Sequence, residues 1–131
     1  MTREEVEILA NVLFSETKDI EDAKNIVNVI LNRTKRPERF GATVSDVVFS
    51  PNQFSGVGSN EWNKAASKKF DSKEEAIYKQ LYQVAYLAAT GKLEDTTGGA
   101  DHYFNPKIVK PKWAAKMRKT AETGSHAYYK E

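Results

Sequence analysis

The chain has 131 residues and a mass of 14.8 kDa, and the size and balance of 40% hydrophobic and 29% charged residues predict one folded domain, residues 1–131. The absence of cysteine excludes a disulfide scaffold, a thiol nucleophile and a cysteine-based zinc site. The two histidines, His102 and His126, leave little material for a multi-histidine metal site, so we expect no metal site. We also expect no cofactor. The net charge is +2, but the charges are unevenly distributed along the chain. Residues 1–101 carry 13 basic and 16 acidic side chains, whereas residues 102–131 carry 7 basic and 2 acidic side chains.

The N-terminal segment lacks the positive and then apolar pattern of a secretory signal. No apolar run approaches the roughly 20 residues of a membrane-spanning helix. We therefore expect a protein that is made in the cytoplasm and has no membrane partner. We also expect it to be a monomer.

The first two predicted helices are amphipathic. Thr2 and Glu5 have the spacing of a capping box, and apolar residues follow at helical spacing as far as Phe14. Glu16 is the last residue of this helix. Viewed down the helix axis, it lies about 20° from Leu9, at the edge of the apolar stripe. A second helix is expected to begin near residue 19 or 22 and to stop before Pro37.

The remaining chain alternates irregular segments with short elements. Residues 38–61 read as irregular, with a helical turn at 45–49. Ser72 and Glu75 suggest a second capping box, which opens a helix closed by Gly91. Its inward side chains are expected to be Ala76, Ile77, Leu81, Val84, Ala85 and Ala88. Residues 102–104 and 127–129 are predicted strands, and residues 113–121 read as a last helix. The predicted fold is mainly α (α+β), with about five helices and a small β-hairpin.

Carboxylate chemistry is the chemistry that the residue inventory favours. The chain has no glycine-rich nucleotide-binding motif, no HExxH zinc motif and no GxSxG serine motif. Glu16 is the best candidate, because partial burial at the end of an apolar helix favours a neutral carboxyl group that can donate a proton. The alternative is that Glu16 is a solvated helix end.

Aromatic and polar side chains occur together in three segments. A carbohydrate site needs flat apolar faces and a few directional polar groups. Because strand side chains alternate between two faces, about half of the strand aromatics are expected in the core instead. The candidate substrate-binding residues are Gln53, Phe54, Ser55, His102, Tyr103, Asn105, His126 and Tyr128.

The basic residues of 102–131 fit three interpretations. They could meet nucleic-acid phosphates, an anionic cell-wall polymer, or only solvent. No zinc finger, RNA-recognition signature or helix-turn-helix is recognisable, and the acidic balance of residues 1–101 argues against a broad phosphate-binding surface. We therefore expect no nucleic-acid partner, although a small DNA-binding protein remains an alternative.

An ordered set of short motifs spans nearly the whole chain. In order, they are Phe14-Ser15-Glu16-Thr17, Ile30-Leu31-Asn32-Arg33, Val47-Val48-Phe49, Gln53-Phe54-Ser55, Asp95-Thr96-Thr97-Gly98-Gly99-Ala100, His102-Tyr103-Phe104-Asn105-Pro106, Trp113 and Gly124-Ser125-His126-Ala127-Tyr128-Tyr129. With this set, the chain resembles the cell-wall hydrolase family typified by the catalytic domain of spore cortex-lytic enzymes. Ser15 and Thr17 replace the small residues that usually flank the family's glutamate.

The resemblance implies a lysozyme-like fold and cleavage of peptidoglycan strands at the bond from N-acetylmuramic acid to N-acetylglucosamine. It maps the catalytic acid to Glu16 and favours a lytic transglycosylase, which forms 1,6-anhydro-muramoyl ends. Tyr103 would lie nearest the reacting sugar ring.

Two alternatives stay open within this resemblance. One is a hydrolytic muramidase, with Asp46, Asp95 or Asp101 as a second carboxylate. The other is a wall-binding module without catalysis. Without an export signal, the chain fits a phage lysis enzyme, a virion-associated enzyme or an excised domain that acts on the bacterial wall.

Overall fold

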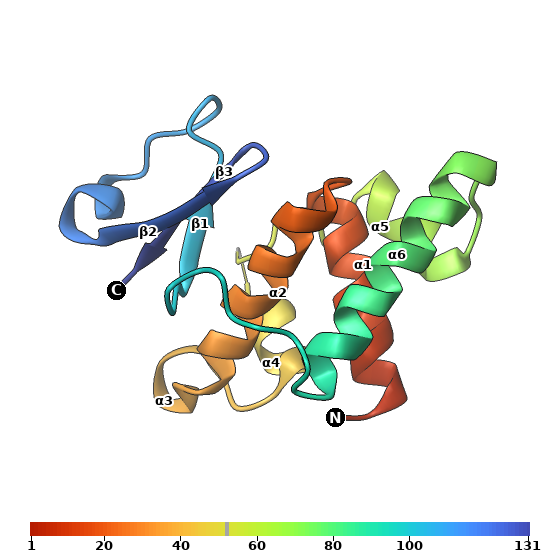
Figure 1. The fold of residues 1–131 in the computed structure, drawn as a ribbon, viewed down its shortest axis with the longest axis horizontal. Helices are drawn as coiled ribbons and strands as arrows, with labels where there is room; N and C mark the ends of the chain where they lie inside the picture. Colours follow the sequence, from red (N-terminus) through yellow and green to blue (C-terminus); the bar gives the residue numbers. More distant parts are fainter. Residues whose placement is uncertain (52) are drawn as a thin grey trace.

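The computed structural model describes residues 1–51 and 53–131 (Figure 1). The described residues form α1 (Arg3–Glu16), α2 (Ile20–Thr34), α3 (Pro37–Phe40), α4 (Val44–Val48), α5 (Asn60–Ser67), α6 (Ser72–Ala89), β1 (His102–Phe104), the 3-10 helix η1 (Lys112–Lys116), β2 (Arg118–Thr123) and β3 (His126–Lys130). The sheet and η1 lie at the upper left of Figure 1, and helices α1 to α6 form the lower and right-hand parts of the molecule. The mainly helical fold with a small β element is confirmed.

The long helices begin at side-chain caps. Thr2 and Glu5 form the predicted capping box of α1, and Asp19 caps α2 by accepting from the Asp22 backbone N–H. The capping box of α6 lies one residue earlier than expected, with Asp71 as the cap and Glu74 as its partner. A carboxylate at this position accepts from the same free backbone N–H groups as a serine would.

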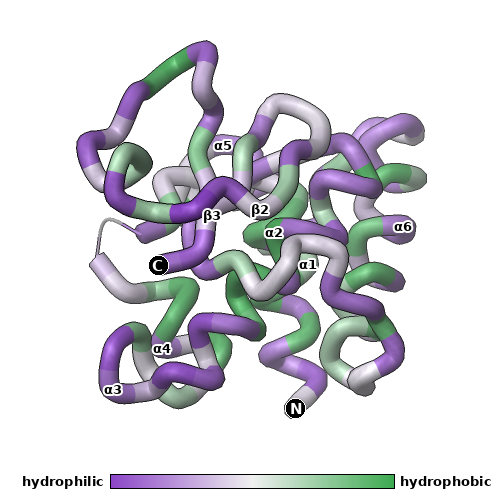
Figure 2. Tube along the Cα trace, turned by 60° about the vertical axis from the view of Figure 1, so that its left-hand side comes forward, coloured by the Kyte–Doolittle hydropathy of each residue, from purple (hydrophilic) through white to green (hydrophobic). Residues whose placement is uncertain are grey.

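The core is formed where α1, α2 and α6 pack together. Figure 2 shows hydrophobic stretches along these helices. Leu9, Leu13, Phe14, Ile26 and Ile30 are fully buried, and burial of each such side chain stabilises the fold by roughly 1.5–3 kcal/mol. On α6, Leu81, Val84, Ala85 and Ala88 are buried as predicted. Ala76 is exposed, because Tyr78 occupies the first inward position.

Two helices were not expected: α3 lies at the start of the segment 38–61 that was expected to be irregular, and α5 begins at its end. Pro37 stops α2 but also opens α3, because its fixed φ suits the first position of a helix. Ser59 caps α5 by accepting from the Trp62 backbone N–H. The predicted turn near residues 45–49 is present as α4.

The predicted last helix at residues 113–121 is wrong. Residues 112–116 form η1, and β2 then pairs with β3 in antiparallel register from Arg118↔Lys130 to Thr123↔His126. Gly124, at φ +54°, provides the left-handed conformation that the tight turn between the two strands needs. The expected two-stranded ribbon is therefore a three-stranded sheet of order β1-β3-β2.

Among residues 1–51 and 53–131, no helix is long and apolar enough to span a bilayer.

Candidate active site

A cleft of about 900 Å³ lies between the C-terminal end of α1 and the sheet. Its volume is within the range of ligand-binding clefts, roughly 300–1,000 Å³. One wall comes from residues 15–19 and α5, and the other from β1 and the β2–β3 turn. Gln53, Ser55 and Gly56 line the cleft between them. Of the predicted site residues, Glu16, Gln53, Ser55, Tyr103, Asn105 and His126 line it.

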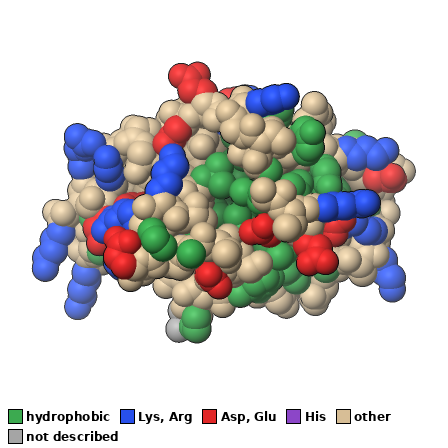
Figure 3. All heavy atoms as spheres, turned by 90° about the horizontal axis from the view of Figure 1, so that it is seen from below, with side chains coloured by type: hydrophobic (Ala, Val, Ile, Leu, Met, Phe, Trp, Pro, Cys, Tyr) green, Lys and Arg blue, Asp and Glu red, His purple; other side chains and the backbone are tan. Residues whose placement is uncertain are grey.

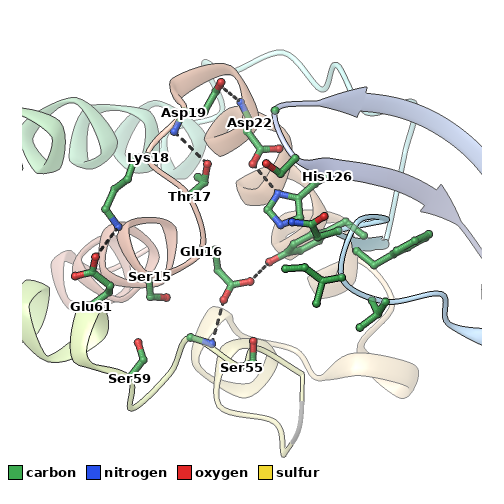
Figure 4. A pocket seen from close by; sticks show the side chains of 18 of the residues that line it. Ser15, Glu16, Thr17, Lys18, Asp19, Asp22, Ser55, Ser59, Glu61 and His126 are labelled. Atoms are coloured by element: carbon green, nitrogen blue, oxygen red, sulfur yellow. Dashed lines mark hydrogen bonds and ion pairs between the residues drawn. The ribbon is translucent and has the colours of Figure 1, made fainter.

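The Glu16 carboxylate is held at both oxygens near the middle of the cleft (Figure 4). Oε1 accepts a 2.5 Å hydrogen bond from the Tyr103 hydroxyl, and Oε2 accepts a 3.1 Å hydrogen bond from the Gly56 N–H. The α1 helix ends at Glu16, so the side chain projects from a rigid element. The structure thus brings together a carboxylate from α1, a phenol from β1 and a backbone amide from a loop.

Gly56 approaches Glu16 more closely than any other residue type could. A Cβ atom at this position would lie 2.5 Å from Glu16 Oε2 and 2.3 Å from Ser15 Oγ. Sequence reasoning gave Gly56 no role in the site. The sequence feature that could have drawn attention to Gly56 is its position directly after the Gln53-Phe54-Ser55 motif. Its close approach to Glu16, forty positions away along the chain, is visible only in the fold.

Tyr103 remains a neutral hydrogen-bond donor in this arrangement. Burial raises the pKa of the Tyr103 hydroxyl well above its usual value, and the adjacent Glu16 carboxylate raises it further. The ring stacks on Tyr128 at a centroid separation of 5.6 Å and meets the His126 ring edge-on at 5.0 Å. These two rings fix the direction of the hydroxyl toward Glu16.

Behind Tyr103, the buried Asp22 carboxylate accepts hydrogen bonds from three side chains. Oδ1 accepts from Tyr128 at 2.6 Å and from Thr123 at 3.0 Å, and Oδ2 lies 2.7 Å from Nδ1 of His126. Burial would raise the pKa of Asp22, but the hydrogen bonds from His126, Tyr128 and Thr123 outweigh it and lower the pKa. Because an ionised carboxylate can only accept, Nδ1 of His126 carries a proton. Sequence reasoning missed Asp22.

Tyr128 and Phe54 lie behind the cleft wall. Tyr128 is fully buried, and Phe54 is 6% exposed. The Phe54 ring packs beside Tyr103 and lies 5.3 Å from the guanidinium carbon of Arg33. Neither side chain lines the cleft, so both support residues that do.

Arg33 organises the cleft floor from below. Its Nε donates to the Asp101 carbonyl at 2.8 Å, and its Nη1 donates to Gln53 Oε1 at 3.2 Å. Burial lowers the pKa of Arg33, although nearby Tyr103 and Asp101 oppose this shift. Arg33 lies in the Leu31-Asn32-Arg33 motif, and sequence reasoning gave it no role in the site.

His102 faces away from the cleft. Its Nδ1 lies 2.9 Å from Asp101 Oδ1, and its ring packs against Trp113 and Phe40. Asn105 lines the cleft and also caps the following turn, because its Oδ1 accepts from the Lys107 N–H at 2.9 Å.

The three carboxylates considered as partners of Glu16 lie outside the cleft lining. Asp46 is exposed on α4. Asp95 accepts from Asn32 and Thr97 in a polar turn. Asp101 is buried and contacts Arg36, His102 and the backbone of Glu131.

The cleft has other carboxylates, and each is already engaged. Asp19 caps α2, and Asp22 accepts from three side chains. Glu61 is ion-paired with Lys18 at 3.5 Å and with Lys64 at 3.3 Å. In the described part of the chain, no cluster of three or more His, Asp or Glu side chains could hold a metal ion.

Comparison with known proteins confirms the expected family. The model of the Cell Wall Hydrolase family matches residues 18–129, a range that begins two residues after Glu16. A comparison with curated proteins gave no match.

Two solved structures are similar in fold. One is the catalytic domain of the germination-specific lytic transglycosylase SleB from Bacillus anthracis, with a TM-score of 0.73 and 24% identity over 99% of this chain and 97% of that one. The other is the catalytic domain of the Bacillus cereus SleB protein, with a TM-score of 0.76 and 24% identity over 98% and 91%. Because the family model covers most of the sequence, this chain belongs to the cell wall hydrolase family.

Proposed function

We propose that this protein cleaves peptidoglycan glycan strands between N-acetylmuramic acid and N-acetylglucosamine, as a lytic transglycosylase with Glu16 as its acid and base. The observation that carries the proposal is the Glu16 carboxylate, fixed by Tyr103 and Gly56 in the cleft of a chain with the SleB fold. Family membership supports the wall as substrate.

The proposed reaction needs one group that gives and then takes a proton. Protonated Glu16 donates to the glycosidic oxygen as the bond from that oxygen to muramoyl C1 breaks. The resulting carboxylate then takes the proton of the muramoyl C6 hydroxyl, whose oxygen bonds to C1. The products are a free N-acetylglucosamine hydroxyl and a 1,6-anhydro ring, and Glu16 returns to its protonated form.

The contacts of Glu16 suit both protonation states. The Gly56 N–H can only donate, so it always faces a lone pair of Oε2. A phenol can donate or accept, so Tyr103 can stay bonded to Glu16 whether or not the acid carries its proton. The acid therefore keeps its position through both steps, as an efficient proton transfer requires.

A single-carboxylate mechanism fits the engagement of the other cleft carboxylates. Hydrolysis by the usual route needs a second carboxylate as base or nucleophile. Asp22 accepts hydrogen bonds from three side chains, and Asp19 caps α2. Glu61 is ion-paired with Lys18 and Lys64. These existing contacts favour Glu16 as the carboxylate that carries the reaction alone. We infer that Gln53, Ser55, Asn105 and His126 orient the sugars from the cleft lining.

Product analysis tests the proposal. Purified glycan strands are digested with the protein, and the new ends are identified by mass spectrometry. Transglycosylation predicts 1,6-anhydro-muramoyl ends, which are 18 mass units (one water) lighter than reducing ends. Reducing ends would contradict it in favour of a hydrolytic muramidase, and wall binding without new ends would indicate a non-catalytic module.

A further inference from the structure

The loop after β1 has a fixed conformation at the rim of the cleft. This rim loop (residues 105–112) begins at Asn105, whose carbonyl accepts from the N–H groups of Ile108 at 3.0 Å and Val109 at 3.1 Å. The Asn105 side chain also accepts from the Lys107 N–H in this turn. Pro106 comes directly after Asn105, and Pro111 comes directly after Lys110. The side chains of the loop are therefore presented in a set arrangement.

Two aliphatic side chains of the rim loop are exposed although they border the cleft. Ile108 is 76% exposed and Val109 is 48% exposed, and both line the cleft. Figure 2 shows this hydrophobic stretch between hydrophilic ones in the loop at the upper left. Contiguous exposed apolar surface is a feature of interaction sites and ligand-binding grooves, and these two neighbouring side chains border a cleft.

Lysines flank this aliphatic pair. Lys107, Lys110 and Lys112 are exposed, and no ion pair of theirs is found within residues 1–51 and 53–131. The chain has six basic residues and no acidic one between Asp101 and Glu122. On the face seen from below, Lys and Arg side chains project at both ends of the molecule (Figure 3). The cleft lining itself carries four carboxylates. The rim loop is therefore positively charged, whereas the cleft lining is mainly negatively charged.

We propose that the rim loop binds the peptide stem of the muramoyl residue, with the lysines on its carboxylates and Ile108 and Val109 against its apolar side chains. The inference rests on the proposed function. With the sugars in the cleft, a stem attached through the lactyl group would have to leave the cleft at its edge, and the rim loop forms part of that edge. A stem offers alanine methyl groups and free carboxylates along one short chain. An anionic wall polymer of glycerol phosphates would match the lysines but not the aliphatic pair.

Paired substrates and matched variants test this proposal. Turnover is measured on peptide-bearing strands and on strands stripped of stems by an amidase, for wild type, a Lys107/Lys110/Lys112→Gln triple variant and an Ile108→Ser/Val109→Ser double variant. The control is Lys69/Lys73/Lys92→Gln, which removes the same charge from exposed positions on the α6 side of the molecule. All these side chains are exposed, so the folds are expected to survive, and thermal melting checks this.

Wild type is expected to prefer peptide-bearing strands. Each rim variant should lower kcat/KM on those strands about tenfold, through KM. The lysine variant should change turnover of stripped strands less than twofold, and the aliphatic variant should lose less on stripped strands than on peptide-bearing ones. The effect of the lysines should weaken in high salt. Equal losses on both substrates, or an equal loss in the control, would overturn the proposal.

Direct binding separates this inference from the proposed function. A soluble muramoyl peptide and the same sugar without its peptide are titrated into wild type and the rim variants. Peptide-dependent binding that the rim variants lose supports the stem site even if no glycan bond is cleaved. Cleavage without such binding, or displacement of the peptide by polyglycerol phosphate at equal concentration, would refute the stem site and leave the activity standing.

Discussion

Replacing Gly56 with alanine tests whether the position of the Glu16 carboxylate controls activity. The φ of Gly56 is not positive, so alanine adds no backbone strain. The added Cβ would lie 2.5 Å from Glu16 Oε2 and 2.3 Å from Ser15 Oγ, whereas ordinary contacts begin near 3.4 Å. The carboxylate must therefore move by about 1 Å or lose the Gly56 hydrogen bond.

The expected loss is larger for activity than for stability. A displacement of about 1 Å in a reacting group can cost roughly 10²-fold in rate. Overpacking by one methyl group destabilises a fold by about 1–3 kcal/mol, which leaves most domains folded. We therefore expect Gly56→Ala to lower kcat about 100-fold on purified glycan strands, while thermal unfolding remains cooperative.

Gly58 supplies the matched control. It has φ +84°, so alanine there strains the backbone, but a Cβ would meet nothing within 4 Å. Gly58→Ala should thus lower the free energy of unfolding by about 1 kcal/mol and leave kcat within a few-fold of wild type. Full activity in Gly56→Ala, or an equal loss of kcat in Gly58→Ala, would refute the reasoning.

Three further predictions follow from the same contacts. Tyr103→Phe removes the 2.5 Å hydrogen bond to Glu16 and should lower kcat about 10- to 100-fold in steady-state assays; unchanged kcat would show that the phenol is dispensable. Asp22→Asn weakens the bond that holds His126 and should lower the free energy of unfolding by about 2–3 kcal/mol in urea titrations at pH 7. Because the pKa of Asp22 is lowered in the fold, its contribution is present above about pH 3.9 and is lost as the pH falls through the folded value, so the variant's stability should depend less on pH there. Thr2→Ala removes the α1 cap and should cost about 1 kcal/mol of stability without changing kcat; a kcat loss would indicate that the cleft responds to the far end of α1.

Local sequence signals predicted the helices that carry their own caps and apolar stripes. The capping box at Thr2 and the cap at Asp19 are short-range features, so their positions could be read directly. The segment at residues 113–121 is different, because its helix-forming residues are overridden by pairing with β3. Gly124 and Ser125 between two short runs were a hairpin signal, and they outweighed the helical propensity of the preceding residues.

The site was predictable only in part for a related reason. Glu16 stood out because it ends an apolar helix, and Tyr103 because it lies in an aromatic strand motif. The Gly56 contact and the Asp22–His126 pair depend on side chains brought together across the fold, so spacing along the chain carried no signal for them.

The most direct test of the account is the activity of Glu16→Gln on purified glycan strands. The amide can still accept from the Gly56 N–H and donate to the Tyr103 hydroxyl, so the fold and the cleft should be kept. General acid–base catalysis contributes about 10²–10⁴-fold to a rate. We therefore expect the rate at which new strand ends are released to fall by at least about 100-fold, with an unchanged melting temperature. Substantial activity in this folded variant would contradict the assignment of Glu16 as the acid.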